Sequence, residues 1–192
     1  MNSRAAQMSR ALCLLLLSVP LLSCNTAAVK KSYMALDAEG NRKRSVFFTD
    51  TDSIYCIGEL AVGRKDVSVE AALRSTALAL PTTGELVPIE SVIAVKDVSP
   101  ASTGSDVKVS FQLLKVEHPK DPWQAGKFVC DLSIDGVVET STPFEIQYPP
   151  CPFQPPIDGE GCAGFFLPQS VCPGAIAPQS CTCTDLGAWQ CN

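Results

Sequence analysis

The chain has 192 residues and a formal charge of −5 at neutral pH. Removing an N-terminal segment that carries Arg4 and Arg10 leaves roughly 170 residues with a charge of about −7, which argues against nucleic acid as a partner. This length accommodates one ordinary core, so any further unit needs covalent cross-links. After Lys127 the sequence holds acidic residues but neither Lys nor Arg.

The N-terminus has the pattern of a secretion signal. Arg4 and Arg10 precede an apolar run from Ala11 to Leu22, which is a charged segment followed by a short hydrophobic one. The run is shorter than the roughly 20 apolar residues that a membrane-spanning helix needs. We therefore expect residues 1–23 to be a signal peptide and the mature protein to lie outside the cytoplasm.

The apolar run ends in Leu21-Leu22-Ser23-Cys24, which resembles the bacterial lipobox. The resemblance implies that cleavage precedes Cys24 and that its thiol carries lipid. It also implies that this lipid anchors the protein in a cell-envelope membrane, facing the periplasm or the exterior. Stable anchoring takes two or more acyl chains. The alternative is an ordinary signal cut near Thr26-Ala27-Ala28, which would discard Cys24.

Residues 25–44 show little hydrophobic periodicity. We expect 24–44 to form the lipidated Cys and a flexible tether. Its basic residues, Lys30-Lys31 and Arg42-Lys43-Arg44, are expected to be solvated, with contact to anionic head groups as the alternative.

From Ser45 to Tyr148 the sequence consists of short alternating runs. Apolar residues recur at every second position with polar residues between them, which predicts half-buried strands. Asp135-Gly136 supplies the positive φ of a tight hairpin turn. Only Val69 to Leu80 has the composition of a helix, and its front half alternates as a strand does. The predicted inward positions are Ile54, Cys56, Leu60, Val62, Val67, Val69, Ala71, Leu73, Val107, Val109, Phe111, Leu113, Phe128, Cys130, Leu132, Ile134, Phe144, Ile146 and Tyr148.

Seven or eight short strands in about a hundred residues predict an all-β sandwich over 45–148. Cys56 lies on an early strand, and Gly126-Lys127-Phe128-Val129-Cys130 leads to a second inward Cys. This arrangement resembles an immunoglobulin-like domain, although Trp123 precedes the late strand instead of following the first Cys. The resemblance implies an antiparallel β-sandwich with a Cys56–Cys130 disulfide, and export favours such a bond over two thiols.

The C-terminal segment, residues 149–192, is rich in cysteine, proline and glycine. Its apolar residues are too few for a conventional core, so we expect three internal disulfides. In an extended Cys181-Thr182-Cys183 both thiols point the same way and need different partners. The segment resembles small cysteine-rich modules of secreted proteins, and Pro149-Pro150 is expected to act as a spacer. Zinc is the competing hypothesis. The tail cysteines are Cys151, Cys162, Cys172, Cys181, Cys183 and Cys191.

Catalytic patterns are weak. The sole histidine, His118, stands in a proline-rich stretch and is expected to be exposed. Asp50 with Asp52, and Asp131 with Asp135, are possible carboxylate pairs, and the first pair also offers oxygen ligands to calcium. We expect no cofactor and no catalytic or metal residue.

These patterns predict a non-catalytic, lipid-anchored binding module of the cell envelope. Its partners would be the membrane, through the anchor, and an envelope protein or glycan. Two alternatives belong to other classes: an envelope hydrolase that uses carboxylates, and a protease inhibitor that presents a rigid loop such as Leu167-Pro168-Gln169.

Overall fold

The computed structural model describes residues 27–64, 66–98, 103–113, 122–176 and 178–192. Within these ranges every regular element is a β-strand, so the all-β prediction is confirmed. The described part contains no helix that is long and apolar enough to cross a membrane. The signal peptide, Cys24 and His118 lie outside the described residues.

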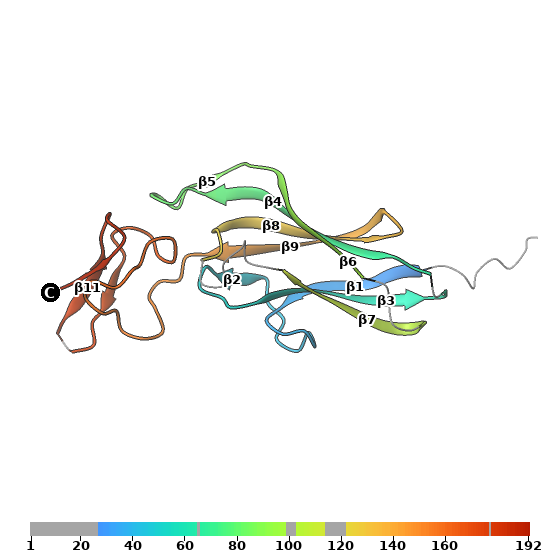
Figure 1. Cartoon of the computed structure of the whole chain (residues 1–192), viewed down its shortest axis with the longest axis horizontal. Helices are drawn as coiled ribbons and strands as arrows, with labels where there is room; N and C mark the ends of the chain where they lie inside the picture. The colour runs from blue at the N-terminus through green and yellow to red at the C-terminus, as the bar shows by residue number, and fades with distance from the viewer. Residues whose placement is uncertain (1–26, 65, 99–102, 114–121, 177) are drawn as a thin grey trace, which may run out of the picture.

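Nine strands form two facing layers (Figure 1). One layer is a three-stranded antiparallel sheet with the order β1-β3-β7. The other has the order β2-β9-β8-β4, and both β5 and β6 pair with β4. The bounds are β1 Ala27–Ala35, β2 Val46–Phe48, β3 Ile54–Val62, β4 Val69–Ala79, β5 Leu86–Val87, β6 Ser91–Val98, β7 Gly104–Leu113, β8 Gly126–Ile134 and β9 Val137–Gln147.

The core lies between the two layers and contains every predicted inward position except Tyr148, which is half-buried outside it, together with Met34, Phe47 and Trp123. Alternate residues of β3, β4, β7 and β8 are buried, because successive side chains of a strand point to opposite faces. The Cys56–Cys130 disulfide joins β3 of one sheet to β8 of the other, with 6.5 Å between the Cα atoms. Val69–Ala79 is a strand, as its alternation predicted. Asp135 and Gly136 form the predicted turn, with φ of 50° and 80°.

The expected flexible tether is wrong for the residues from Ala27 onward. Ala27–Ala35 form β1, which pairs antiparallel with β3 from Ala27↔Val62 to Ala35↔Tyr55. The register shifts between Val29 and Lys31. A register shift interrupts period-two alternation, which explains why the sequence showed no strand pattern here. The core of the fold therefore includes Met34, which is 1% exposed.

The tail has a small sheet of its own, in the order β10-β11-β12 (Val171–Pro173, Ser180–Cys183 and Trp189–Cys191). Cys181 and Cys183 bond to two different partners, as the extended Cys-x-Cys predicted. Phe166 and Trp189 pack at 5.2 Å between ring centroids, so the tail has a core of sulfur and two aromatic rings. The three disulfides are Cys151–Cys172, Cys162–Cys183 and Cys181–Cys191.

The tail contacts the sandwich, which differs from the expected spacer. The Thr49 hydroxyl donates to the Phe165 carbonyl at 2.7 Å, and Thr49 is fully buried. The Leu167 side chain lies against Gly84, so near that a methyl group added at Gly84 would come within 3.2 Å of it. Pro149, in the expected spacer, is buried. These contacts attach the tail to the end of the sandwich where β2 and β9 finish.

Candidate functional site

A loop between β1 and β2, residues 36–44, folds back beside the strand that precedes it; we call it the return loop. Two backbone hydrogen bonds at its base join Leu36 N to Arg42 O and Arg44 N to Met34 O, both at 3.0 Å. At its tip Gly40 has φ of 71°, a conformation that glycine adopts without a steric cost. The return loop is therefore an ordered hairpin-like turn.

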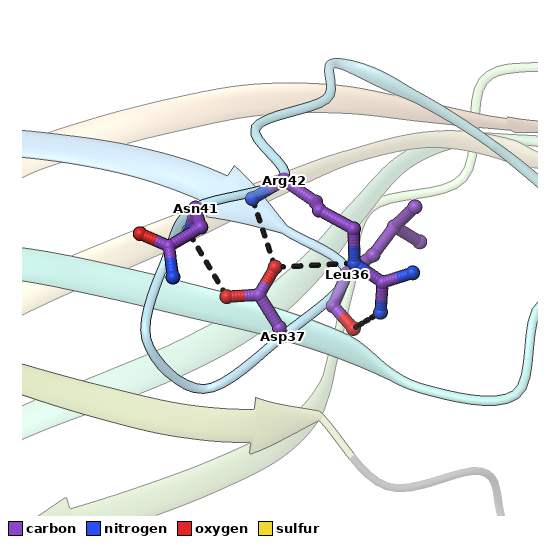
Figure 2. A network of polar contacts seen from close by, with 4 residues as sticks. All are labelled: Leu36, Asp37, Asn41 and Arg42. Carbon is purple, nitrogen blue, oxygen red and sulfur yellow. Dashed lines mark hydrogen bonds and ion pairs between the residues drawn. The ribbon is translucent and has the colours of Figure 1, made fainter.

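One carboxylate organises the return loop (Figure 2). Asp37 accepts hydrogen bonds from the backbone N of Asn41 at 2.9 Å and from the backbone N of Arg42 at 2.8 Å. The Arg42 Nε also donates to Asp37 at 3.3 Å, and its guanidinium donates to the Leu36 carbonyl. The backbone hydrogen bond from Asn41, followed by those from Arg42, lowers the pKa of Asp37 below its ordinary value.

The return loop packs on the outer face of the three-stranded sheet. The Lys43 ammonium sits 3.7 Å from the centroid of the Tyr33 ring, a cation–π contact. Lys108 on β7 donates to the Glu39 carbonyl at 2.8 Å. Tyr33 donates to Glu59 at 3.0 Å, and burial, followed by this carboxylate, raises the pKa of the Tyr33 phenol. These contacts hold the side chains of Arg42 and Lys43, and the backbone bond from Arg44 to Met34 positions the residue that follows them.

Two grooves flank the return loop and share Leu36 and Thr51. The first, which we call the basic groove, has a volume of about 640 Å³. It combines the cations of Lys43 and Arg44 with the apolar side chains of β2, of which Val46 and Phe48 are each 40% exposed. The second groove has a volume of about 480 Å³ and is lined by Asp37, Glu39, Arg42, Asp52 and Tyr55, among others.

The edge strand β2 is closed to strand addition at Phe48. The Phe48 backbone N donates to Thr51 Oγ1, and the Thr51 backbone N donates to the Phe48 carbonyl, both at 3.0 Å. An added strand needs unpaired backbone groups at the edge. Ligand contacts in the basic groove would therefore come mainly from side chains: a cationic pair beside two apolar groups.

Asp131 and Asp135, one of the two carboxylate pairs singled out in the sequence, have separate partners. Asp131 accepts from Arg74 Nε at 3.1 Å and from Ser141 at 2.5 Å, and the hydrogen bond that Arg74 donates to Asp131 raises the pKa of Arg74. Asp135 instead pairs with Arg64 and accepts from the Ser68 backbone N. Each carboxylate of that pair thus has its own cation.

The structure also gives the positions of the possible calcium ligands and of the tail loop. Asp50 and Asp52 are exposed, and Asp52 lines the second groove. In the part of the chain that the structure describes, no cluster of three or more His, Cys, Asp or Glu has metal-binding geometry. In the loop Leu167-Pro168-Gln169, Leu167 lies against Gly84, and Gln169 is exposed and donates to Asp185.

Sequence reasoning missed the basic groove because it assigned Arg42-Lys43-Arg44 to a tether. The signal that could have found the loop is Asp37 three residues before Gly40. An acidic side chain that accepts from backbone N–H groups, followed by a glycine with positive φ, is typical of an ordered turn.

No known protein-family model matches the sequence, and no curated protein matches it. Solved structures with a partial likeness include the alkylpurine DNA glycosylase AlkC of Pseudomonas fluorescens bound to DNA containing an abasic site analog, and the β-glucosidase of Listeria innocua in complex with gluconolactone. Each has a TM-score of 0.35 and 11% identity over 64% of this chain. The chain spans 30% of the first protein and 16% of the second.

Proposed function

We propose that this protein is a non-catalytic binding module, held at a cell-envelope membrane by lipid on Cys24 and facing the periplasm or the cell exterior. The four disulfides support a location outside the reducing cytoplasm. The motif Leu21-Leu22-Ser23-Cys24 at the end of an apolar run supports the lipid anchor. A lipid anchor keeps such a module at the membrane while leaving its surface accessible to a partner.

We further infer that the sandwich is immunoglobulin-like. Two facing sheets joined by the Cys56–Cys130 disulfide support this, as does the place of Cys130 on β8, the strand that begins at Gly126. The position of the tryptophan departs from the immunoglobulin pattern. Trp123 is 7% exposed and donates its indole N–H to the Thr51 carbonyl at 2.7 Å. This Trp fills the core from the segment before β8, where it also fixes the loop that leads into β3.

The observation that carries the binding function is the basic groove. Lys43 and Arg44 supply positive charge beside the exposed Val46 and Phe48, and the return loop that presents them is braced by Asp37 and Tyr33. Binding sites combine apolar surface with a few placed polar groups on a rigid support. The groove therefore suits a ligand with an acidic group next to an apolar one, such as an acidic segment of an envelope protein.

Affinity capture with a charge-reversed groove tests this function. The mature protein and its Lys43→Glu/Arg44→Glu variant would be used to capture partners from envelope extract. Lys127→Glu is the control, because Lys127 is also exposed but lies outside the basic groove. We expect a partner that the wild type and K127E retain and the groove variant loses. Equal capture by all three proteins would contradict the proposed role of the groove.

A further inference from the structure

The chain enters the fold at the end opposite to the cysteine-rich tail (Figure 1). β1 begins at Ala27, which pairs with Val62 at the end of β3. The turn after β3 is joined to the β8–β9 hairpin, because Arg64 pairs with Asp135 and the Asp135 backbone N donates to the Ser68 carbonyl. The start of β1, the β3–β4 turn and the tip of the β8–β9 hairpin thus form one surface, which we call the anchor-side end.

Very little chain separates this end from the proposed lipid. Cys24 and Ala27 are three residues apart, and three extended residues span at most about 11 Å. A long tether would let the fold tumble above a bilayer, whereas this spacing keeps the anchor-side end next to the lipid head groups. The ordered β1 replaces the tether that the sequence suggested, and this is what makes the orientation of the protein predictable.

The chemistry of the anchor-side end suits a lipid surface. Val137 and Val138 follow the hairpin turn and are 61% and 57% exposed, on opposite faces of the strand. Two apolar side chains at the tip of a hairpin are unusual, because turns ordinarily carry polar residues. Asp106 is paired with Lys30, and Asp135 and Asp66 share Arg64, while Glu139, directly after the two valines, is exposed. The end therefore presents two apolar side chains, with Asp106 and Asp135 beside them held in ion pairs.

We propose that the sandwich stands directly on the bilayer through its anchor-side end, with Val137 and Val138 at the lipid surface and the cysteine-rich tail outermost. This rests on the proposed lipid at Cys24. The nine residues of β1 rise about 26 Å, at about 3.3 Å per residue. Lys43 and Arg44 lie beside the last three residues of β1, well outside the screening length of about 8 Å at physiological salt. Their charge is available to a partner in solution and not to head groups.

Site-specific tryptophan quenching tests this orientation. Val137→Trp and Leu186→Trp both replace exposed apolar residues, and Leu186 in the tail is 96% exposed. Each variant of the lipidated protein would be reconstituted in phosphatidylcholine vesicles with and without nitroxide-labelled lipid. The unsubstituted protein corrects for Trp123 and Trp189, which are buried. We expect about a twofold loss of emission for V137W, because interfacial side chains sit within reach of labelled lipid, and no change for L186W.

A second sample separates this proposal from the lipid modification itself. The other eight mature cysteines are paired in disulfides, so an unlipidated chain that begins at Cys24 couples through that thiol to a maleimide lipid. If the natural protein carries no lipid, the proposed anchor fails, and the coupled sample still reports the orientation. Quenching of V137W alone in the coupled sample supports an orientation with the anchor-side end on the bilayer. Equal quenching of both variants, or none at V137W on vesicle-bound protein, overturns it.

Discussion

The Thr49 hydroxyl donates a hydrogen bond to the Phe165 carbonyl at 2.7 Å, across a sequence separation of 116 residues. Thr49 has no exposed surface, so this bond lies inside the junction between the sandwich and the tail. The Thr49 backbone also accepts from Trp123 N and donates to Gln147 O. The loop before β3 therefore connects the tail, the core and the end of β9.

Thr49→Val removes the hydroxyl and keeps the shape of the side chain. We expect the free energy of unfolding to fall by about 1 kcal/mol, because the Phe165 carbonyl loses its donor at a half-buried site. Thr76→Val is the control, since the Thr76 hydroxyl also donates to a carbonyl, that of Lys127, at a partly exposed site; its loss is expected to be smaller. Urea denaturation measures both. Equal effects would contradict the buried junction.

The Cys56–Cys130 disulfide closes 74 residues of chain. Replacing both cysteines with Ala is expected to lower the free energy of unfolding by about 4 kcal/mol, because the unfolded chain regains the entropy that the closed loop removed. The Cys151→Ala/Cys172→Ala pair removes a tail disulfide that spans 21 residues and is expected to disorder the tail first. Thermal unfolding, with NMR spectra of the tail amides, separates the two effects. An unchanged free energy of unfolding without Cys56–Cys130 would refute the first expectation.

Gly40→Ala and Gly136→Ala form a matched pair, because both glycines have positive φ. A methyl group on Gly40 would come within 2.8 Å of the Tyr33 hydroxyl, while one on Gly136 would meet nothing within 4 Å. In both variants, alanine at positive φ is expected to lower the free energy of unfolding by about 1 kcal/mol. We expect G40A alone to displace the return loop, seen as shifted NMR signals of the Tyr33 ring and the Lys43 side chain. Equal perturbation of both sites would mean that the loop does not pack on Tyr33.

The return loop should respond to acid through Asp37. Its pKa is lowered by hydrogen bonds from the Asn41 and Arg42 backbone, so the carboxylate stabilises the loop above the ordinary Asp value of about 3.9 and loses this effect as the pH falls through the lowered pKa. The amide NMR shifts of Asn41 and Arg42 should follow that titration. Asp37→Asn should abolish the pH response, whereas Glu39→Gln, in the same loop, should leave it intact.

Much of the sandwich was predictable because its strands have one buried and one exposed face. The inward positions of β3, β7, β8 and the first half of β4 fall on every second residue, and period two is the direct consequence of strand geometry. The Asp135-Gly136 turn followed from its residue types. The disulfides followed from even cysteine counts on both sides of Pro149.

The basic groove and the tail junction were not predictable, for two physical reasons. β1 is an edge strand with a register shift, so its residues do not alternate. The burial of Ile57, which points away from the main core and yet has no exposed surface, depends on packing at the outer face that no local pattern encodes. The Thr49–Phe165 bond joins residues far apart in sequence, and their contact depends on how the tail disulfides fold.

The mass of the mature N-terminal peptide, measured from purified envelope membranes, tests the central claim most directly. The proposed orientation of the fold and the proposed availability of the basic groove both depend on the proposed lipid at Cys24. We predict a peptide that begins at Cys24 and carries acyl chains, and we predict that Cys24→Ser yields either released protein or uncleaved precursor. An unmodified N-terminus after Ala28 in wild-type protein would contradict the account.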